Sequence, residues 1–195
     1  LDPVIRRTDN VLITERLVDE IEQASRRISD LVKSIKSYTH MDQAIQLDAV
    51  DIRPGIENTL TMLGHKLKKK QIEVDLEIPE DLPQVHGIVG ELNQVWTNLL
   101  DNAIDALPKG GLINIKAFCL PDLVRVKLID NGTGIPEEVQ SRIFEPFFTT
   151  KGIGEGTGLG LDIVKKVLHN HKGSIDLNSE PGRTEFCISL PISKK

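Results

Sequence analysis

The spacing of apolar residues near the start of the chain predicts one long helix over residues 14–46. Apolar positions recur there at alternating steps of four and three residues: Leu17, Ile21, Ala24, Ile28, Leu31, Ile35 and Tyr38. This heptad spacing is typical of a helix that packs along a seam. The stripe either lies on the core of its own domain or forms a helical bundle with a second chain. We favour the bundle, because the stripe is long and precedes the compact part of the sequence.

The rest of the chain alternates between helical and strand patterns. The expected helices cover 54–70, 90–107 and 159–171, and the expected strands cover 71–78, 112–118, 123–129, 174–177 and 184–190. A short extended link is expected at 48–53 and an irregular stretch at 130–158. Strands with unevenly interleaved helices predict an α+β fold. We therefore expect a two-layer α/β sandwich over 48–195, a mixed and mostly antiparallel sheet with helices on one face, preceded by the long helix in 1–47.

The apolar runs and the charge of the sequence argue against two broad classes of function. At 195 residues the chain is long enough for one domain with a core and an appendage. No apolar run approaches the roughly 18 residues that a membrane span needs, and a net charge of −5 argues against nucleic acid as a partner. The basic run at 66–70 is either a phosphate patch or the solvated last turn of a helix, where cations suit the dipole, and we favour the latter.

The cysteines and the first residue bear on where the protein works. Cys119 and Cys187 lie far apart in strand-like stretches and form no Cys-x-x-Cys pair, which predicts small core residues in a reducing compartment. No secretory signal opens the chain, and its first residue is Leu1 rather than methionine. We expect a cytoplasmic piece of a longer protein.

Glycine stands at every second position from Gly152 to Gly160, just before the predicted helix at 159–171. Glycine loses more backbone entropy on folding than any other residue, so this density needs a compensating gain. A loop that runs directly into a helix can turn its backbone N–H groups toward an anion at the positive end of the helix dipole. A flexible linker would be rich in glycine and serine and would not run straight into Leu159. Because neither the Walker A nor the dinucleotide pattern is present, the stretch predicts a phosphate loop of a third kind.

Two asparagines share one face of the predicted helix at 90–107. Asn98 and Asn102 are four residues apart, so their amides project together while their apolar neighbours face the core. Asparagine is a mediocre helix former, so two of them on an apolar helix need a reason. Amide oxygens suit Mg²⁺, which takes a few protein oxygens together with phosphates and water. The alternative is a pair of core amides that bond a neighbouring loop.

A polar turn follows the predicted strand at 123–129. Asn131-Gly132 is typical of a hairpin, but no strand follows, and a helix starts at Pro136 instead. Asp130 therefore ends a strand with its carboxylate at the edge of a site, where the glycines allow close approach. Such a carboxylate can accept a hydrogen bond from the exocyclic amine of adenine.

Three of the five phenylalanines fall within five residues, Phe144, Phe147 and Phe148. They either anchor a mobile flap to the body of the domain or form a small satellite core. Lys151 follows at the edge of the glycine loop. Its side chain either reaches a terminal phosphate or is solvated.

Taken together, these clusters resemble the catalytic ATP-binding domain of sensor histidine kinases, within the Bergerat-fold ATPase and kinase superfamily. The asparagine box of the family matches at Asn98 and Asn102, and its first glycine box matches at Asp130, Gly132 and Gly134. The phenylalanine box matches at 144–148, and the second glycine box matches at 154–161. One box alone would be weak evidence, whereas four in the family's order are specific. The helix at 14–46 resembles the second helix of the hairpin through which these kinases dimerise and carry their phosphoacceptor histidine.

The resemblance implies cofactors, partners and a role for each matching residue. ATP and Mg²⁺ would bind, with Asn102 as the metal ligand, Asn98 assisting it, and Asp130 holding the adenine amine. Residues 135–157 would form a lid over the nucleotide. Further nucleotide contacts are expected at Gly132, Gly134, Ile135, Phe147, Lys151, Gly156, Thr157, Gly158, Leu159 and Thr184, and Asn98, Asn102 and Lys151 would take part in the transfer. The full protein would form a homodimer through the N-terminal helix and act on the receiver domain of a response regulator.

The sequence departs from the family at its histidines. The kinases phosphorylate a histidine followed by an acidic residue, within His-Glu/Asp-x-x-x-Pro. The five histidines here, His40, His65, His86, His169 and His171, precede Met, Lys, Gly, Asn and Lys. We therefore expect the acceptor upstream of residue 1, and a chain that binds ATP without labelling itself.

Three alternative functions stay open. An ATP hydrolase of the gyrase, mismatch-repair or heat-shock-chaperone type would carry a glutamate at the position of Asn98, where an amide cannot act as a general base. A serine kinase of the anti-sigma type would lack the long heptad helix. A non-catalytic ATP-binding module would bind the nucleotide without transferring phosphate.

Overall fold

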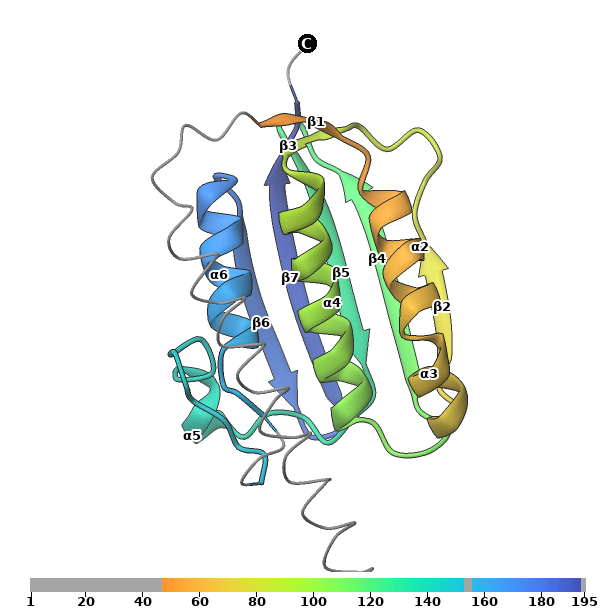
Figure 1. Cartoon of the computed structure of the whole chain (residues 1–195), viewed down its shortest axis with the longest axis vertical. Helices are drawn as coiled ribbons and strands as arrows, with labels where there is room; N and C mark the ends of the chain where they lie inside the picture. Colours follow the sequence, from red (N-terminus) through yellow and green to blue (C-terminus); the bar gives the residue numbers. More distant parts are fainter. Residues whose placement is uncertain (1–46, 153–155, 194–195) are drawn as a thin grey trace, which may run out of the picture. The chain divides into compact units, whose positions relative to one another are not determined.

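A five-stranded sheet forms the frame of the domain (Figure 1). The structure, a computed structural model, describes residues 47–152 and 156–193, so the helix predicted at 14–46 lies outside the described residues. In the order in which they lie side by side, the strands are β2 (Glu73–Glu77), β4 (Leu112–Cys119), β5 (Leu123–Asp130), β7 (Arg183–Pro191) and β6 (Ser174–Glu180). β2 runs parallel to β4, and the other neighbouring pairs are antiparallel. The predicted mixed, mostly antiparallel sheet is confirmed.

The larger helices cover one face of this sheet (Figure 1). They are α2 (Ile52–Met62), α3 (Gly64–Lys70), α4 (Val89–Ala106) and α6 (Gly160–Asn170). The short helix α5 (Glu137–Gln140) lies beside β6, at the edge of the sheet. Together the sheet and the helices make an α+β fold.

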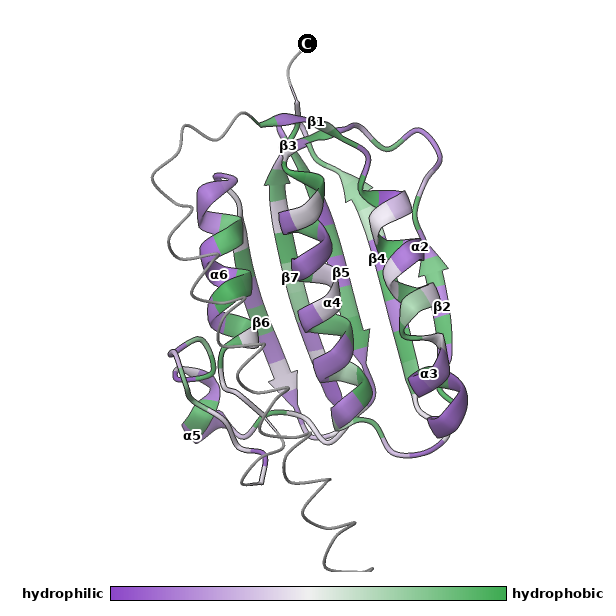
Figure 2. Ribbon diagram, viewed as in Figure 1, coloured by the Kyte–Doolittle hydropathy of each residue, from purple (hydrophilic) through white to green (hydrophobic). Residues whose placement is uncertain are grey.

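The core lies between α4 and the central strands. Every second residue of β5 is buried, and the apolar members of that row meet a buried stripe on α4 that includes Leu92, Val95, Leu99 and Leu100. Figure 2 shows the same division at the centre of the sheet: β7, behind α4, is largely hydrophobic, and the outward surface of α4 is largely hydrophilic. Each fully buried leucine side chain contributes about 1.5–3 kcal/mol to folding. Packing therefore holds α4, and with it Asn98 and Asn102, in one orientation against the sheet.

Two predictions about the start of the domain were wrong in part. The link expected at 48–53 contains the strand β1 (Asp48–Val50), which pairs antiparallel with β3 (Val85–Gly87), a strand of three residues that is too short to show a period in the sequence. α2 begins at Ile52, before Pro54, with Asp51 as its N-cap. The single helix expected at 54–70 is divided at Leu63 into α2 and α3.

Three further findings concern the cysteines, the strands and the membrane. Cys119 is exposed and Cys187 is half-buried, so the prediction of two core cysteines was wrong. Cys187 lies on the sheet face that alternates with the apolar buried row of β7, whereas Cys119 follows the buried row of β4 but is exposed because it is the last residue of that strand. β6 continues to Glu180, three residues beyond the predicted strand at 174–177. Among the residues that the structure describes, none of the helices is both long enough and apolar enough to cross a membrane.

Candidate functional site

Asp130 is a buried carboxylate at the end of β5. It continues the row of buried side chains on that strand, and only 3% of its surface is exposed. Within the described part of the chain, the structure gives it one hydrogen-bond donor, the Gly132 amide, 2.9 Å from Oδ1. Burial raises the pKa of the Asp130 carboxyl above its ordinary value of 3.8, and the Gly132 amide opposes this in part. A carboxylate kept in such surroundings is a candidate for ligand binding.

The neighbouring strands tie the loop after Asp130 to the end of β6. Thr184 lies directly opposite Asp130 in the β5–β7 register and is also buried. Its Oγ1 is 3.2 Å from the hydroxyl oxygen of Ser179, which accepts a hydrogen bond from the Ile135 amide at 2.8 Å. The Gln140 side-chain amide donates to the carbonyl oxygens of Ile135 and Ser179. Sequence reasoning missed Ser179 and Gln140, since neither lies in a recognised motif.

Two glycines of the loop allow approaches that a side chain would block. Gly134 has a φ of +77°, and a Cβ there would lie 2.3 Å from the Glu180 carbonyl oxygen. A Cβ on Gly132 would lie 2.9 Å from the carbonyl oxygen of Ala106, the last residue of α4. Contacts this short exclude any larger residue unless the backbone moves. The loop therefore contacts both β6 and α4.

The two asparagines lie on the same side of α4, between that loop and the start of α6. Both are half-buried, beside the fully packed residues Leu99, Leu100, Ala103 and Ile104. Asn98 is next to α6, because its Oδ1 lies 3.3 Å from the position of a Cβ on Gly160. Its Nδ2 is buried and has no hydrogen-bond partner among the described residues. Asn102 is four residues from both Asn98 and Ala106, about 6 Å along the helix from each.

The start of α6 lies against residues 144–148, the segment that contains three phenylalanines. Leu159 is the N-cap residue, and no side chain caps the helix there. Gly158 has a φ of +67°, and a Cβ on it would lie 2.4 Å from the backbone carbon of Phe147. Phe147 itself has a φ of +64°. The backbone N–H groups of the first turn, which an α-helix leaves without an internal acceptor, therefore lie beside Asn98.

The phenylalanines divide into two anchors and one exposed ring. Phe144 and Phe148 are partly buried against the core, whereas 67% of the surface of Phe147 is exposed. The Arg142 guanidinium lies 4.5 Å from the ring centre of Phe148, and the Lys165 ammonium of α6 lies 5.7 Å from that of Phe144. Both distances are those of cation–π contacts. The two anchors attach this segment to the core and to α6.

Lys151, Gly156 and Thr157, which are predicted phosphate contacts, lie in the segment Thr149–Thr157, of which the structure describes 149–152 and 156–157. In that segment the Lys151 amide donates to the hydroxyl oxygen of Thr149 at 3.1 Å. A Cβ on Gly156 would lie 2.9 Å from the same oxygen. The roles of Lys151, Gly156 and Thr157 toward the residues above stay predictions.

Within the described ranges, no group of three or more His, Cys, Asp and Glu side chains could hold a metal ion. An ion here would depend on amide oxygens and on oxygens of a ligand. That donor set suits Mg²⁺, which keeps several water or phosphate oxygens when it binds to proteins.

Comparison with known proteins identifies this arrangement. Residues 87–194 match the model of the family described as histidine kinase-, DNA gyrase B-, and HSP90-like ATPase. The chain belongs to this family. The sensor kinase CckA of Brucella abortus is 34% identical over 98% of this chain, which corresponds to 22% of CckA. The chain thus spans about a fifth of that relative.

Solved structures narrow the assignment within the family. The catalytic domain of the histidine kinase ThkA is 30% identical, with a TM-score of 0.69, over 77% of this chain and 100% of that one. ThkA in complex with the response regulator protein TrrA is 26% identical, with a TM-score of 0.71, over 99% of this chain and 53% of that one. Residues 87–194 thus correspond to the ATP-binding catalytic domain of histidine kinases, and the resemblance drawn from the four boxes is confirmed.

Proposed function

We propose that residues 48–195 bind Mg²⁺ and ATP and transfer the γ-phosphoryl group to a histidine outside this chain. The observation that supports this most is that α4 contacts both the start of α6 and the loop after β5. Asn98 lies against Gly160 at the start of α6, and Ala106 lies against Gly132. Asn102 lies between Asn98 and Ala106 on the same side of α4. The proposed site for the base is then on the Ala106 side of Asn102, and the proposed site for the phosphates is on the Asn98 side.

The adenine is proposed to bind at the Asp130 end. The ionised Asp130 carboxylate has several acceptor positions, and the described residues give it one donor, the Gly132 amide. It can therefore also accept a hydrogen bond from the exocyclic amine of adenine. Gly132, Gly134 and Ile135 would shape this end, and Thr184 would support it from the opposite strand. Since Asp130 is buried and the described residues give its carboxylate no cation, an adenine amine would supply a favourable partner.

The phosphates are proposed to lie at the start of α6. The N–H groups of its first turn and the buried Nδ2 of Asn98 are donors that phosphate oxygens would satisfy. Asn102, assisted by Asn98, would hold Mg²⁺ through its amide oxygen, and the ion when bound would neutralise phosphate charge. Gly158, Leu159 and Phe147 would border this end. Lys151, Gly156 and Thr157 are proposed to reach the phosphates from the lid at 135–157.

Phosphoryl transfer requires that the reacting groups be positioned and that the phosphate charge be neutralised, and it requires no protein nucleophile from this domain. The bond between the γ-phosphorus and its bridging oxygen breaks, ADP leaves, and a bond forms to an imidazole nitrogen of the acceptor. His171 is unsuited as this acceptor: it is buried, its Nδ1 lies 2.7 Å from the Val167 carbonyl oxygen, and its Nε2 accepts a hydrogen bond from the Ile88 amide. A hydrolase is disfavoured, because the Asn98 amide cannot activate water.

The remainder of the proposal concerns the whole protein. Residues 1–47 would be part of a helical hairpin that dimerises and presents the acceptor histidine. A response regulator receiver domain would take the phosphoryl group next, as the solved ThkA complex with TrrA suggests. We place this exchange in the cytoplasm, where ATP is available.

The test is a transfer between separate molecules. The chain is mixed with Mg²⁺, radiolabelled ATP and a separately produced hairpin that carries the acceptor histidine. We expect acid-labile label on the hairpin and none on the chain, and no label on the hairpin when Asn102→Ala replaces the wild type. Acid-labile label on the chain itself, or a folded chain with no affinity for ATP, would contradict the proposal.

A further inference from the structure

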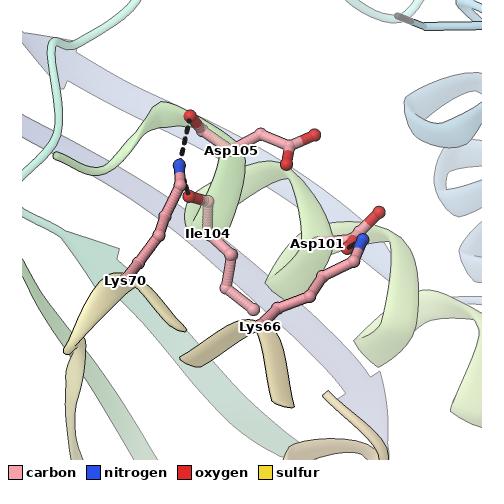
Figure 3. Close-up of polar contacts among 5 residues, drawn as sticks. All are labelled: Lys66, Lys70, Asp101, Ile104 and Asp105. Atoms are coloured by element: carbon pink, nitrogen blue, oxygen red, sulfur yellow. Dashed lines mark hydrogen bonds and ion pairs between the residues drawn. The ribbon is translucent and has the colours of Figure 1, made fainter. Parts of the chain in front are cut away.

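The side chain of Lys70 caps a helix other than its own (Figure 3). Lys70 is the last residue of α3, and its Nζ donates to three carbonyl oxygens at the end of α4. The distances are 2.7 Å to Ile104, 3.2 Å to Asp105 and 2.9 Å to Leu107. Its own carbonyl oxygen accepts a hydrogen bond from the Gly110 amide at 2.8 Å, so the chain after α4 is bound to the same residue.

The end of α4 needs this cation for two physical reasons. An α-helix leaves its last four carbonyl groups without internal donors, and its C-terminus carries partial negative charge. α4, which is described throughout its length, has no basic residue in its last turn, and instead carries Asp101 and Asp105 near that end. Lys70 supplies from α3 both the donors and the positive charge. Hydrogen bonds from a charged donor are stronger than neutral ones.

The capped turn is also the turn that contacts the nucleotide-binding loop. Ala106 lies between the carbonyl groups that Lys70 binds, and its own carbonyl oxygen lies against Gly132. Gly132 in turn donates to Asp130. Asn102 is one turn earlier on α4. A shift of the last turn by a fraction of an ångström would therefore move Gly132, and with it the hydrogen bond that orients Asp130.

We propose that Lys70 is a positioning residue for nucleotide binding, acting through the last turn of α4 on Gly132 and Asp130. This inference rests on the proposed function, and it concerns a residue that precedes the family match at 87–194. Lys70 touches no proposed ligand atom. It is instead placed to hold the adenine end of the site at a constant distance from Asn102.

Lys66 offers a matched control on the same helix. It lies one turn before Lys70 and forms an ion pair with Asp101, as Figure 3 shows. Half of the Lys66 side chain is exposed, and exposed ion pairs contribute little, about 0–1 kcal/mol. The ion pair involves no backbone carbonyl of α4. Removing it takes away a lysine and an α3–α4 contact while leaving the end of α4 capped.

The experiment compares Lys70→Met, Lys70→Gln, Lys70→Arg and Lys66→Met in the full chain. Calorimetry with ATP and Mg²⁺ measures affinity, and the amide resonance of Gly132 in ¹⁵N-labelled protein reports the loop without nucleotide. We expect Lys70→Met to weaken ATP binding about tenfold or more, equivalent to one lost hydrogen bond, and to shift the Gly132 resonance. Lys70→Arg should restore most of the affinity, and Lys66→Met should stay within about twofold of the wild type.

Three results would overturn the inference: wild-type affinity in Lys70→Met, an unmoved Gly132 resonance, or equal losses in Lys66→Met and Lys70→Met. If Lys70→Met does not fold, Lys70→Gln, which has a shorter and uncharged polar side chain, decides in its place. If the wild type itself binds no ATP, the proposed function fails, and the Gly132 resonance still decides whether Lys70 positions the loop.

Discussion

Replacing Asp130 by asparagine should separate the stability of the domain from its affinity for ATP. The amide has nearly the shape of the carboxylate, and its oxygen can still accept the Gly132 N–H bond that Oδ1 now accepts at 2.9 Å. What changes is the charge. In the wild type that charge is buried, and the described part of the chain gives it no cation.

For binding, the substitution removes the ionised acceptor of the adenine amine. Hydrogen bonds to charged groups contribute about 1.5–3 kcal/mol, so the dissociation constant for ATP should rise about 10- to 150-fold. Asp130 is only 3% exposed, so water cannot easily take the place of the missing acceptor. The loss should therefore lie toward the upper part of this range.

In the protein without nucleotide, the same substitution should be neutral or stabilising rather than unfavourable. Burial raises the pKa of Asp130 above 3.8, so the unfolded chain loses this proton at a lower pH than the folded chain does. The wild type therefore loses stability as pH rises from about 3.8 through the raised pKa, and the cost reaches its full size once the pH exceeds that raised pKa. Asp130→Asn should unfold at an equal or higher temperature than the wild type at pH 7, and its advantage should shrink as the pH is lowered.

The assay is thermal unfolding with and without saturating Mg²⁺ and ATP, at several pH values. Without nucleotide the variant should be at least as stable as the wild type, and with nucleotide the order should reverse, because a ligand stabilises only the state that binds it. Asp176→Asn, on the exposed side of β6, is the matched control and should change neither curve. A variant that is less stable without nucleotide at every pH, yet binds ATP within twofold, would refute the reasoning.

Three further predictions concern backbone strain, the metal and the ion pairs of the buried Glu185. Gly134→Ala should lower the free energy of unfolding by about 1–3 kcal/mol in urea titrations, more than Gly182→Ala, because both have positive φ but only Gly134 meets a backbone oxygen, at 2.3 Å. Asn102→Ala should bind ATP with an affinity that EDTA no longer changes, and an EDTA effect equal to that of the wild type would contradict its role. Glu185→Gln should destabilise the domain at pH 7. Its deficit should disappear as the pH falls below 4.5, since Lys127, and to a lesser degree Arg183, lower the pKa of Glu185, and this stabilisation is lost when the carboxylate is protonated.

The sequence alone determined the family and most of the regular structure. Four boxes in order predicted a histidine kinase catalytic domain, and alternation along β4 and β5, with the apolar stripe of α4, predicted the sheet and its covering helix. These signals are local, because the helix and strand periods are visible over a few residues. Glycine and asparagine likewise indicate backbone conformations that other residues rarely adopt. The roles of the site residues, and of the heptad helix at 14–46, stay predictions.

Only the tertiary structure decided which distant residues meet. Lys70 reaches carbonyl groups 34 to 37 residues away, and Ser179 binds the Ile135 amide across 44 residues. No local period encodes such contacts, because they follow from the register of β5, β6 and β7 and from how α3 lies against α4. Because the contact with α4 has no local signal, the sequence predicts only a solvated helix end for the basic run at 66–70. Its last lysine does end α3, but its ammonium group caps α4, and that contact appears only when both helices are packed on one sheet.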